Sequence, residues 1–168
     1  FNTRAGIGIP PEIRALVLAR LAPRPGVLLW DVCASSAEVG IEAGRLGAAV
    51  IAVERDAGLC VRIVANAGAH GVDLRLADGE PARVLSELPR PDAVFPQGSR
   101  PDIVRACAGS GAERIVVLVP EIDNLGAVRA TLSAAGYAVG GCQLSSAALV
   151  ELSDGATGLA RAASAFLL

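Results

Sequence analysis

Short apolar runs alternate with helix-like segments along most of this chain. Five runs of the kind that forms buried strands lie at residues 26–34, 48–56, 72–78, 91–98 and 113–120. Segments with helical periodicity follow them, at residues 36–47, 58–71, 81–89, 100–111 and 122–136. Apolar runs of this length separated by helices predict a parallel sheet that is covered by helices on both faces.

The end of the chain departs from this alternation. Residues 137–152 and 162–168 both look like β segments, and no helical pattern separates them, so we expect an antiparallel pair at the sheet edge. The predicted fold class is α/β: a doubly wound, Rossmann-like, mostly parallel seven-stranded sheet with an antiparallel last strand at residues 162–168. We expect one domain over residues 1–168, in which residues 1–25 form a lead-in and a first helix with proline at its start.

The composition supports buried central strands. Apolar residues make up 52 % of the chain and the mean hydropathy is +0.50, as expected where strands are covered on both faces. No apolar run reaches the roughly 18 residues that a membrane-spanning helix needs, and the first residues lack the pattern of a secretory signal. We therefore expect a cytoplasmic protein without a membrane partner. Because the sequence contains no Met, we also expect a processed product or one part of a longer or fused polypeptide.

Charge and cysteine spacing exclude two classes of function. The formal net charge is −2, the fifteen basic residues are scattered arginines, and aromatic residues make up only 3 % of the chain. Nucleic-acid binding therefore has no electrostatic support. Cys33, Cys60, Cys107 and Cys142 are far apart and His70 is the only histidine, so we expect no metal site and interpret the cysteines as small apolar residues in a reducing compartment.

Three acidic residues end three successive predicted strands. They are Asp31, Glu54 and Asp78, and ligands of open parallel sheets bind beyond this edge. Glu54 has the spacing from the first turn that suits recognition of ribose hydroxyls, and Asp78 could accept a hydrogen bond from an adenine amine. The alternative for Asp31 and Asp78 is that each caps a following turn. The three acids together indicate a site for an adenosine cofactor.

The order of these elements resembles the class I S-adenosylmethionine-dependent methyltransferases. More specifically, "EIRALVLARLAPRPGVLLWDV", "IEA", "AVERD" and "PDAVFPQGS" resemble the decarboxylating precorrin-6Y methyltransferases of cobalamin biosynthesis. Members of that family methylate carbon 15 of the corrin precursor and release carbon dioxide from an acetate side chain, and some are the second half of a fused enzyme. The resemblance implies S-adenosylmethionine as cofactor, a precorrin-type tetrapyrrole as substrate, and a homo-oligomer, possibly a tetramer.

The sequence departs from this family in four loops. The glycines of the family's turn align with Cys33, Ser35 and Ala37; if the backbone there needs positive φ, each such residue costs about 1 kcal/mol or more. The lead-in lacks the family's Thr and Lys, and the ends of the fourth and fifth strands are altered. The cofactor residues implied by the resemblance and the strand ends are Asp31, Cys33, Ala34, Ser35, Ala37, Glu54, Arg55, Asp78 and Gly79. The candidate substrate residues are Gln97, Gly98, Ser99, Arg100 and Arg4.

The turn permits a second interpretation. Ser35-x-x-Glu38 has the spacing of a capping box, in which Ser35 and Glu38 would occupy the N–H groups that an anionic ligand uses. This pattern predicts weakened cofactor binding, so the alternative function is a non-catalytic methyltransferase-fold module with a structural or partner-binding role.

Other candidates carry little chemistry. Ser145, Ser146 and His70 lack the G-x-S-x-G turn of a hydrolase, and we interpret Glu42 as an exposed or locally paired helix residue rather than a catalytic one. No catalytic side chain is assigned, because an activated methyl donor and an electron-rich ring carbon chiefly need correct positioning.

Overall fold

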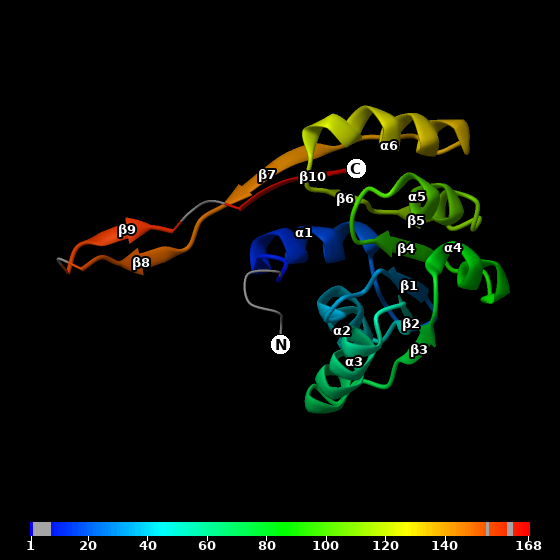
Figure 1. The fold of residues 1–168 in the computed structure, drawn as a ribbon, viewed down its shortest axis with the longest axis horizontal. Coiled ribbons are helices and arrows are strands. Elements are labelled where there is room, and N and C mark those ends of the chain that lie inside the picture. The colour runs from blue at the N-terminus through cyan, green and yellow to red at the C-terminus, as the bar shows by residue number, and fades with distance from the viewer. Residues whose placement is uncertain (2–7, 154, 161–162) are drawn as a thin grey trace.

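A five-stranded parallel sheet forms the centre of the fold (Figure 1). The structure, a computed structural model, describes residues 1, 8–153, 155–160 and 163–168. In the order β3-β2-β1-β4-β5, the strands are Arg75–Asp78, Ala49–Glu54, Leu28–Val32, Ala93–Pro96 and Arg114–Ile115. The order reverses between β1 and β4, so the carboxyl ends of these two strands mark the position where doubly wound sheets bind ligands.

Helices cover both faces of this sheet. On one face lie α1 (Pro11–Leu21), α2 (Glu38–Arg45) and α3 (Ala57–Ala69); on the other lie α4 (Pro81–Val84), the 3-10 turn η1 (Leu85–Glu87) and α5 (Pro101–Ala108). Helix α6 (Ile122–Ala134) packs against α5. Alternation along β1 places Leu29 on the α1 side and Trp30 on the α5 side. The predicted doubly wound α/β arrangement is therefore confirmed.

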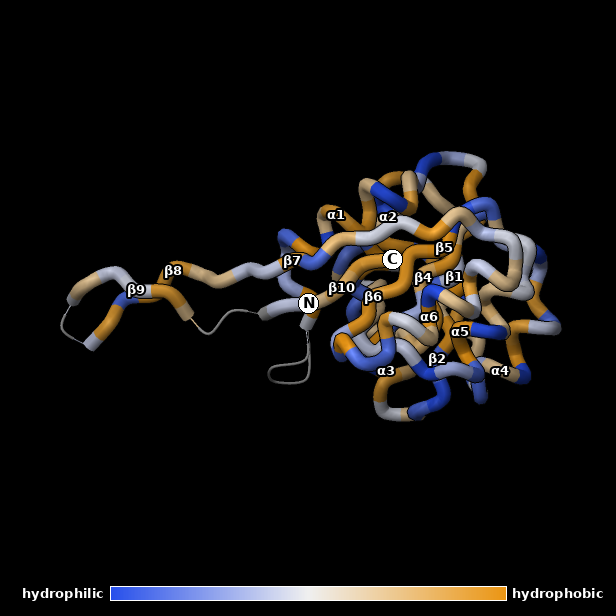
Figure 2. The backbone as a smooth tube through the Cα atoms, turned by 90° about the horizontal axis from the view of Figure 1, so that it is seen from above, coloured by the Kyte–Doolittle hydropathy of each residue, from blue (hydrophilic) through white to orange (hydrophobic). Residues whose placement is uncertain are grey.

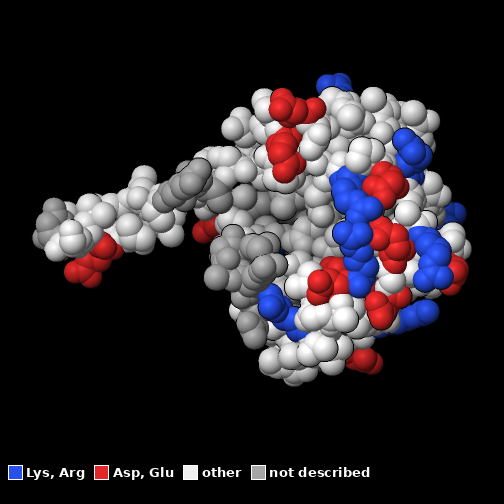
Figure 3. Space-filling model, in the orientation of Figure 1, with Lys and Arg blue, Asp and Glu red and all other residues white. Residues whose placement is uncertain are grey.

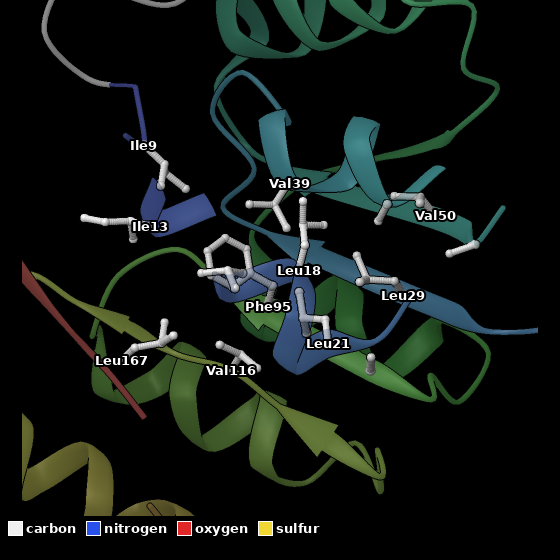
Figure 4. Packing of buried hydrophobic residues seen from close by; sticks show 14 of the residues in the cluster. Ile9, Ile13, Leu18, Leu21, Leu29, Val39, Val50, Phe95, Val116 and Leu167 are labelled. Atoms are coloured by element: carbon white, nitrogen blue, oxygen red, sulfur yellow. The ribbon is translucent and has the colours of Figure 1, made fainter. Parts of the chain in front are cut away.

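Phe95 of β4 occupies the interior of the core on the α1 side (Figure 4). Its side chain is fully buried, in the same cluster as Leu18 and Leu21 of α1 and Leu29 of β1. Burial of a side chain of this size contributes about 1.5–3 kcal/mol. This packing holds α1 against the sheet, and Ile9, just before α1, belongs to the same cluster.

The C-terminal part of the chain forms a separate antiparallel sheet. It has the order β6-β10-β7, with strands Leu118–Val119, Ala163–Leu167 and Cys142–Ser146. The predicted antiparallel last strand is therefore confirmed, but the predicted single seven-stranded sheet is not. The segment between β5 and β6 changes partner, because the Val116 N–H donates to Val94 O and the Val117 N–H donates to Leu168 O.

A two-stranded hairpin projects from the body of the molecule in both views (Figures 1 and 2). Its strands are β8 (Leu149–Glu151) and β9 (Thr157–Leu159), and β9 was not predicted from the sequence. Leu149 is 75 % exposed and Leu159 is 67 % exposed. These two residues face each other across the hairpin, so the fold leaves a pair of large aliphatic side chains in solvent.

Candidate functional site

The turn between β1 and α2 has the backbone conformation of a glycine turn without its glycines. Cys33, Ser35 and Ala37 have φ values of 57°, 55° and 54°. Left-handed backbone costs a non-glycine residue roughly 1–2 kcal/mol. Among the described residues only Ala22 shares this property. The condition set in the sequence analysis, a positive φ at these three positions, is therefore met, and the turn keeps this backbone conformation at a cost in strain.

Asp31 lies beneath this turn and faces helix α2. Its carboxylate is 1 % exposed, and Oδ2 accepts a hydrogen bond of 2.9 Å from the Gly40 N–H. A Cβ at Gly40 would lie 2.8 Å from that oxygen, so this contact requires glycine. Burial raises the pKa of Asp31 to about 7; the Gly40 hydrogen bond opposes the rise, and the nearby Glu38 and Glu54 carboxylates add to it. Asp31 thus positions the start of α2, which supports the capping alternative for this residue.

Glu54 ends β2 and is hydrogen-bonded to main-chain donors on both carboxylate oxygens. Oε2 accepts from the Ser35 N–H at 3.0 Å, while Oε1 accepts from the N–H groups of Arg55 and Asp56 at 2.9 and 3.1 Å. A carboxylate has about four acceptor positions, and three are in use here. One acceptor position, on Oε2, has no donor among the described residues, so a ligand hydroxyl could bind there; a second hydroxyl would compete with the Ser35 N–H.

The end of β3 lies beside the end of β2. Glu54 and Asp78 are paired across the two parallel strands, and the Gly79 N–H donates to Glu54 O at 2.9 Å. Asp78 is exposed, whereas Gly79 has φ 142° and a Cβ there would lie 2.8 Å from Val84 Cγ2. The structure therefore brings together the two acids that the sequence placed at this edge.

Salt bridges connect three loops at the same edge. Glu80 accepts from Arg55 Nη1 and Arg100 Nη2, each at 3.0 Å, and Arg100 also contacts Asp102 at 2.6 Å. The Arg55 guanidinium is the main reason that the pKa of Glu80 is lowered, and Arg100 likewise lowers the pKa of Asp102. Figure 3 shows acidic and basic side chains grouped on one face of the body. Arg55 and Arg100 are thus paired within the protein.

A cavity of about 410 Å³ opens beside the turn. The turn contributes Ser35, and the end of β4 contributes Gln97 and Gly98, two of the predicted substrate residues. Ser99 is not part of the lining; its hydroxyl contacts Asn124 and Glu121 instead. The remaining lining comes from the residues before α1, from α1, from β6 and the residue after it, and from β10: Gly8, Ile9, Pro10, Ile13, Leu118, Pro120, Ser164 and Ala165.

The sequence analysis did not assign these apolar lining residues to the site. The lead-in and the end of the fifth strand were noted only as altered loops. Their meeting depends on the separate antiparallel sheet, which places β10 beside β6. Arg4, the other candidate for contacting substrate carboxylates, lies outside the described residues.

The predicted capping box is wrong. The N-cap of α2 is Ala37, which makes Glu38 the first residue of the helix rather than the third. Ala37 makes no side-chain cap, and Ser35 donates through its main-chain N–H to Glu54 instead. The capping geometry needs an extended N-cap residue three positions before the acid, and the left-handed backbone of the turn prevents it.

The described residues provide no obvious nucleophile or metal centre. All four cysteines are free thiols, and burial raises the pKa of Cys33 to about 11, which keeps this thiol protonated at neutral pH. No group of three potential metal ligands occurs in the described part of the chain. In the same residues, no helix combines the length and the apolar character needed to cross a membrane.

Known proteins share both the sequence pattern and the fold. The precorrin methyltransferase domain family matches residues 10–151. A decarboxylating precorrin-6Y C(5,15)-methyltransferase of Sinorhizobium is 41 % identical over 87 residues, which are 50 % of this chain and 21 % of that protein. A probable decarboxylating cobalt-precorrin-6B C(15)-methyltransferase of Pyrobaculum calidifontis is 31 % identical over 140 residues, which are 77 % of this chain and 71 % of that protein.

Solved structures agree with this relationship. The crystal structure of a precorrin-6Y C5,15-methyltransferase from Geobacter metallireducens has a TM-score of 0.87 and 25 % identity, and the match covers 99 % of this chain and 92 % of that one. The likeness thus extends over nearly the whole chain. On the family match and the shared fold, this chain belongs to the precorrin methyltransferase domain family.

Proposed function

We propose that this domain transfers a methyl group from S-adenosylmethionine to a precorrin-type tetrapyrrole, with decarboxylation, in cobalamin biosynthesis. The observation that carries the proposal is the turn: its three left-handed residues keep a ligand-binding backbone path beside Glu54. A turn without a ligand to accommodate would gain stability by abandoning that path, because each left-handed non-glycine residue is strained.

The cofactor would supply a methyl group on a positive sulfur, which is already reactive toward an electron-rich carbon. The protein then needs to align the two reactants and to exclude water. The largely apolar cavity beside Ser35 suits this task, since it reaches from the turn to the ends of β4 and β6. The protonated Cys33 thiol and the buried Asp31 are not required as reacting groups.

We assign the cofactor to the turn and to the ends of β2 and β3. Glu54 would accept a ribose hydroxyl, and Asp78 and Gly79 would border the adenine, with Arg55 at the rim. The backbone of residues 33–37 would border the methionine part, which includes Cys33, Ala34, Ser35 and Ala37. Asp31 would act by holding α2 through Gly40 rather than by touching the ligand.

On the substrate side, we assign Gln97 and Gly98 to contacts with the tetrapyrrole, because both line the cavity. Arg100 follows Gly98 by two residues in the sequence. It could bind a substrate carboxylate in place of the Asp102 carboxylate, since a guanidinium recognises both in the same way. Ser99 would act through its contacts with Asn124 and Glu121.

Two measurements test the proposal. Calorimetry with S-adenosylhomocysteine should show binding to this domain, and a labelled methyl group should pass from S-adenosylmethionine to a precorrin substrate with release of carbon dioxide. Binding without transfer would retain the cofactor assignment and overturn the substrate assignment. Absence of binding would overturn both.

A non-catalytic role is the second candidate, and one observation favours it. Three of the acceptor positions of Glu54 are taken by main-chain donors, and Arg55 and Arg100 are both paired with Glu80. Binding of adenosine would have to replace some of these contacts. A domain that fails to bind S-adenosylhomocysteine while remaining folded would support this structural or partner-binding role.

We also propose that the domain is a homo-oligomer in the cytoplasm, with a tetramer as the size that the family resemblance suggests. The projecting hairpin exposes Leu149, Leu152 and Leu159, and Figure 3 shows few charged atoms on it. Exposed aliphatic groups of this kind mark association surfaces, and a second copy of the chain could cover them.

The four free thiols are compatible with a reducing compartment.

A further inference from the structure

Ile9, two residues before α1, is held to the rest of the domain by its backbone as well as by its buried side chain. The Ile9 N–H donates to Glu38 Oε2 at 3.0 Å, and Ile9 O accepts from Arg14 Nη1 at 2.9 Å. Arg14 Nη1 also lies 3.2 Å from the same Glu38 oxygen. One carboxylate and one guanidinium therefore bind both polar main-chain atoms of Ile9.

This arrangement is largely shielded from solvent. Ile9 is 6 % exposed, and the side chains of Glu38 and Arg14 are 4 % and 13 % exposed. Hydrogen bonds to ionised groups are stronger than those between neutral groups, and a buried charge that loses its partner is costly. Arg14 has a second carboxylate partner, because its Nε donates to Glu42 Oε1 at 2.7 Å. Among the described residues, by contrast, Glu38 is the acceptor for the Ile9 N–H.

Glu38 also belongs to the turn. It is the first residue of α2 and directly follows Ala37, the last of the three left-handed residues. The cavity beside the turn is lined by Ser35 on one side and by Gly8, Ile9 and Pro10 on another. The two groups of lining residues are 25 or more residues apart in the sequence. Glu38 is hydrogen-bonded to Ile9 of the first group and follows Ser35 by three residues.

We propose that Glu38 is a positioning residue. Through its hydrogen bond to the Ile9 N–H, it holds the side of the cavity that Gly8, Ile9 and Pro10 form. The conformation of the turn and the position of Ile9 are therefore linked. This linkage rests on the proposed function and extends it, because cofactor bound at the turn would change the position of Ile9 in the cavity proposed for the tetrapyrrole. The contact between Glu38 and Ile9 itself does not depend on that function.

Amide hydrogen exchange measured by NMR tests the positioning without any ligand. Glu38→Ala should speed exchange of the Ile9 amide at least tenfold, and Glu38→Gln, which keeps an acceptor oxygen, should speed it less. Glu42→Ala is the matched control, since it removes the other carboxylate partner of Arg14 but leaves the acceptor of Ile9 in place. If Glu38→Ala and Glu42→Ala give the same Ile9 exchange rate, the positioning role is wrong.

The linkage has its own measurement. The Ser35 amide reports on the turn, because it donates to Glu54. Glu38→Ala should raise exchange at Ser35 together with Ile9, whereas a local effect would change Ile9 alone and overturn the linkage. Circular dichroism checks that each variant is folded, and Glu38→Gln provides the comparison if the alanine variant is not.

S-adenosylhomocysteine separates this inference from the proposed function. At saturation, the ligand should slow Ile9 exchange in the parent protein but not in Glu38→Ala. Binding with unchanged Ile9 exchange in the parent would overturn the linkage. Absence of binding in the parent would count against the proposed function, while the ligand-free exchange rates would still decide the role of Glu38.

Discussion

The main-chain N–H of Ser35 donates to Glu54 Oε2 across 3.0 Å and joins the turn after β1 to the end of β2. These are the two places where the cofactor is proposed to bind. The contact satisfies a donor of the strained turn and an acceptor of the buried acid at the same time. A first ribose hydroxyl could use the remaining acceptor position of Oε2, whereas a second would have to replace the Ser35 N–H; affinity depends on the free energy of that exchange.

The first prediction concerns Glu54. Glu54→Ala should weaken S-adenosylhomocysteine binding by about 1.5–3 kcal/mol, or roughly 10- to 150-fold, because a hydrogen bond to a charged group is lost. Calorimetry on the folded variant measures the change. Glu87→Ala, which removes an exposed acid on η1, should leave affinity as in the parent. Equal affinity of Glu54→Ala and the parent would place the ribose elsewhere.

The second prediction concerns strain in the turn. Ser35→Gly should raise the free energy of unfolding by about 1 kcal/mol, because glycine adopts φ 55° without a Cβ clash. Ser133→Gly in helix α6, where the residue is exposed, is the opposite control and should lower stability by roughly 0.5 kcal/mol. Denaturant unfolding measures both. A Ser35→Gly variant that is less stable than the parent would mean that the turn is not strained.

The third prediction concerns the pH dependence of stability. The pKa of Asp31 is raised to about 7 in the folded state, chiefly by burial, so the folded protein binds a proton more tightly than the unfolded chain does. The resulting stabilisation is fully present below the unfolded pKa of about 4, and is lost as pH rises through 7.

Asp31→Asn isolates this contribution, because the amide oxygen can still accept from the Gly40 N–H. The parent should lose stability relative to Asp31→Asn between about pH 4 and 7, by an amount on the order of a few kcal/mol. Denaturation midpoints across this pH range provide the comparison. Parallel pH profiles for the two proteins would show that Asp31 does not titrate in this window.

The fourth prediction concerns the projecting hairpin. Combined Leu149→Ser and Leu159→Ser substitutions should shift the protein toward a smaller species, because two facing exposed leucines would no longer contribute apolar surface to an interface. Light scattering after size-exclusion chromatography measures the mass. Val61→Ser on α3, a residue that is 71 % exposed, should not change it. A parent protein that is already monomeric would contradict the proposed oligomer.

The sequence by itself determined the layered architecture and the edge at which the site lies. Alternating apolar runs and helices specified the parallel sheet, because strands covered on both faces need continuous apolar runs. The positions of Glu54 and Asp78 at strand ends then placed both acids at one edge, since parallel strands end at the same side. Positive φ at Ser35 was a conditional expectation, which followed from comparing its position with a glycine turn.

Only the tertiary structure decided which donors the buried carboxylates accept hydrogen bonds from, and Glu38 is the clearest case. The Ser-x-x-Glu spacing suggested a local cap, but Glu38 instead binds the backbone of Ile9, 29 residues away. The division into a five-stranded and a three-stranded sheet likewise depends on where Val117 finds its partner, Leu168. Residue spacing in the sequence predicts only the contacts within one short segment. The hydrogen bonds of a buried carboxylate or of an extended strand depend on the donors that the folded chain brings within about 3 Å, and these donors come from distant parts of the sequence.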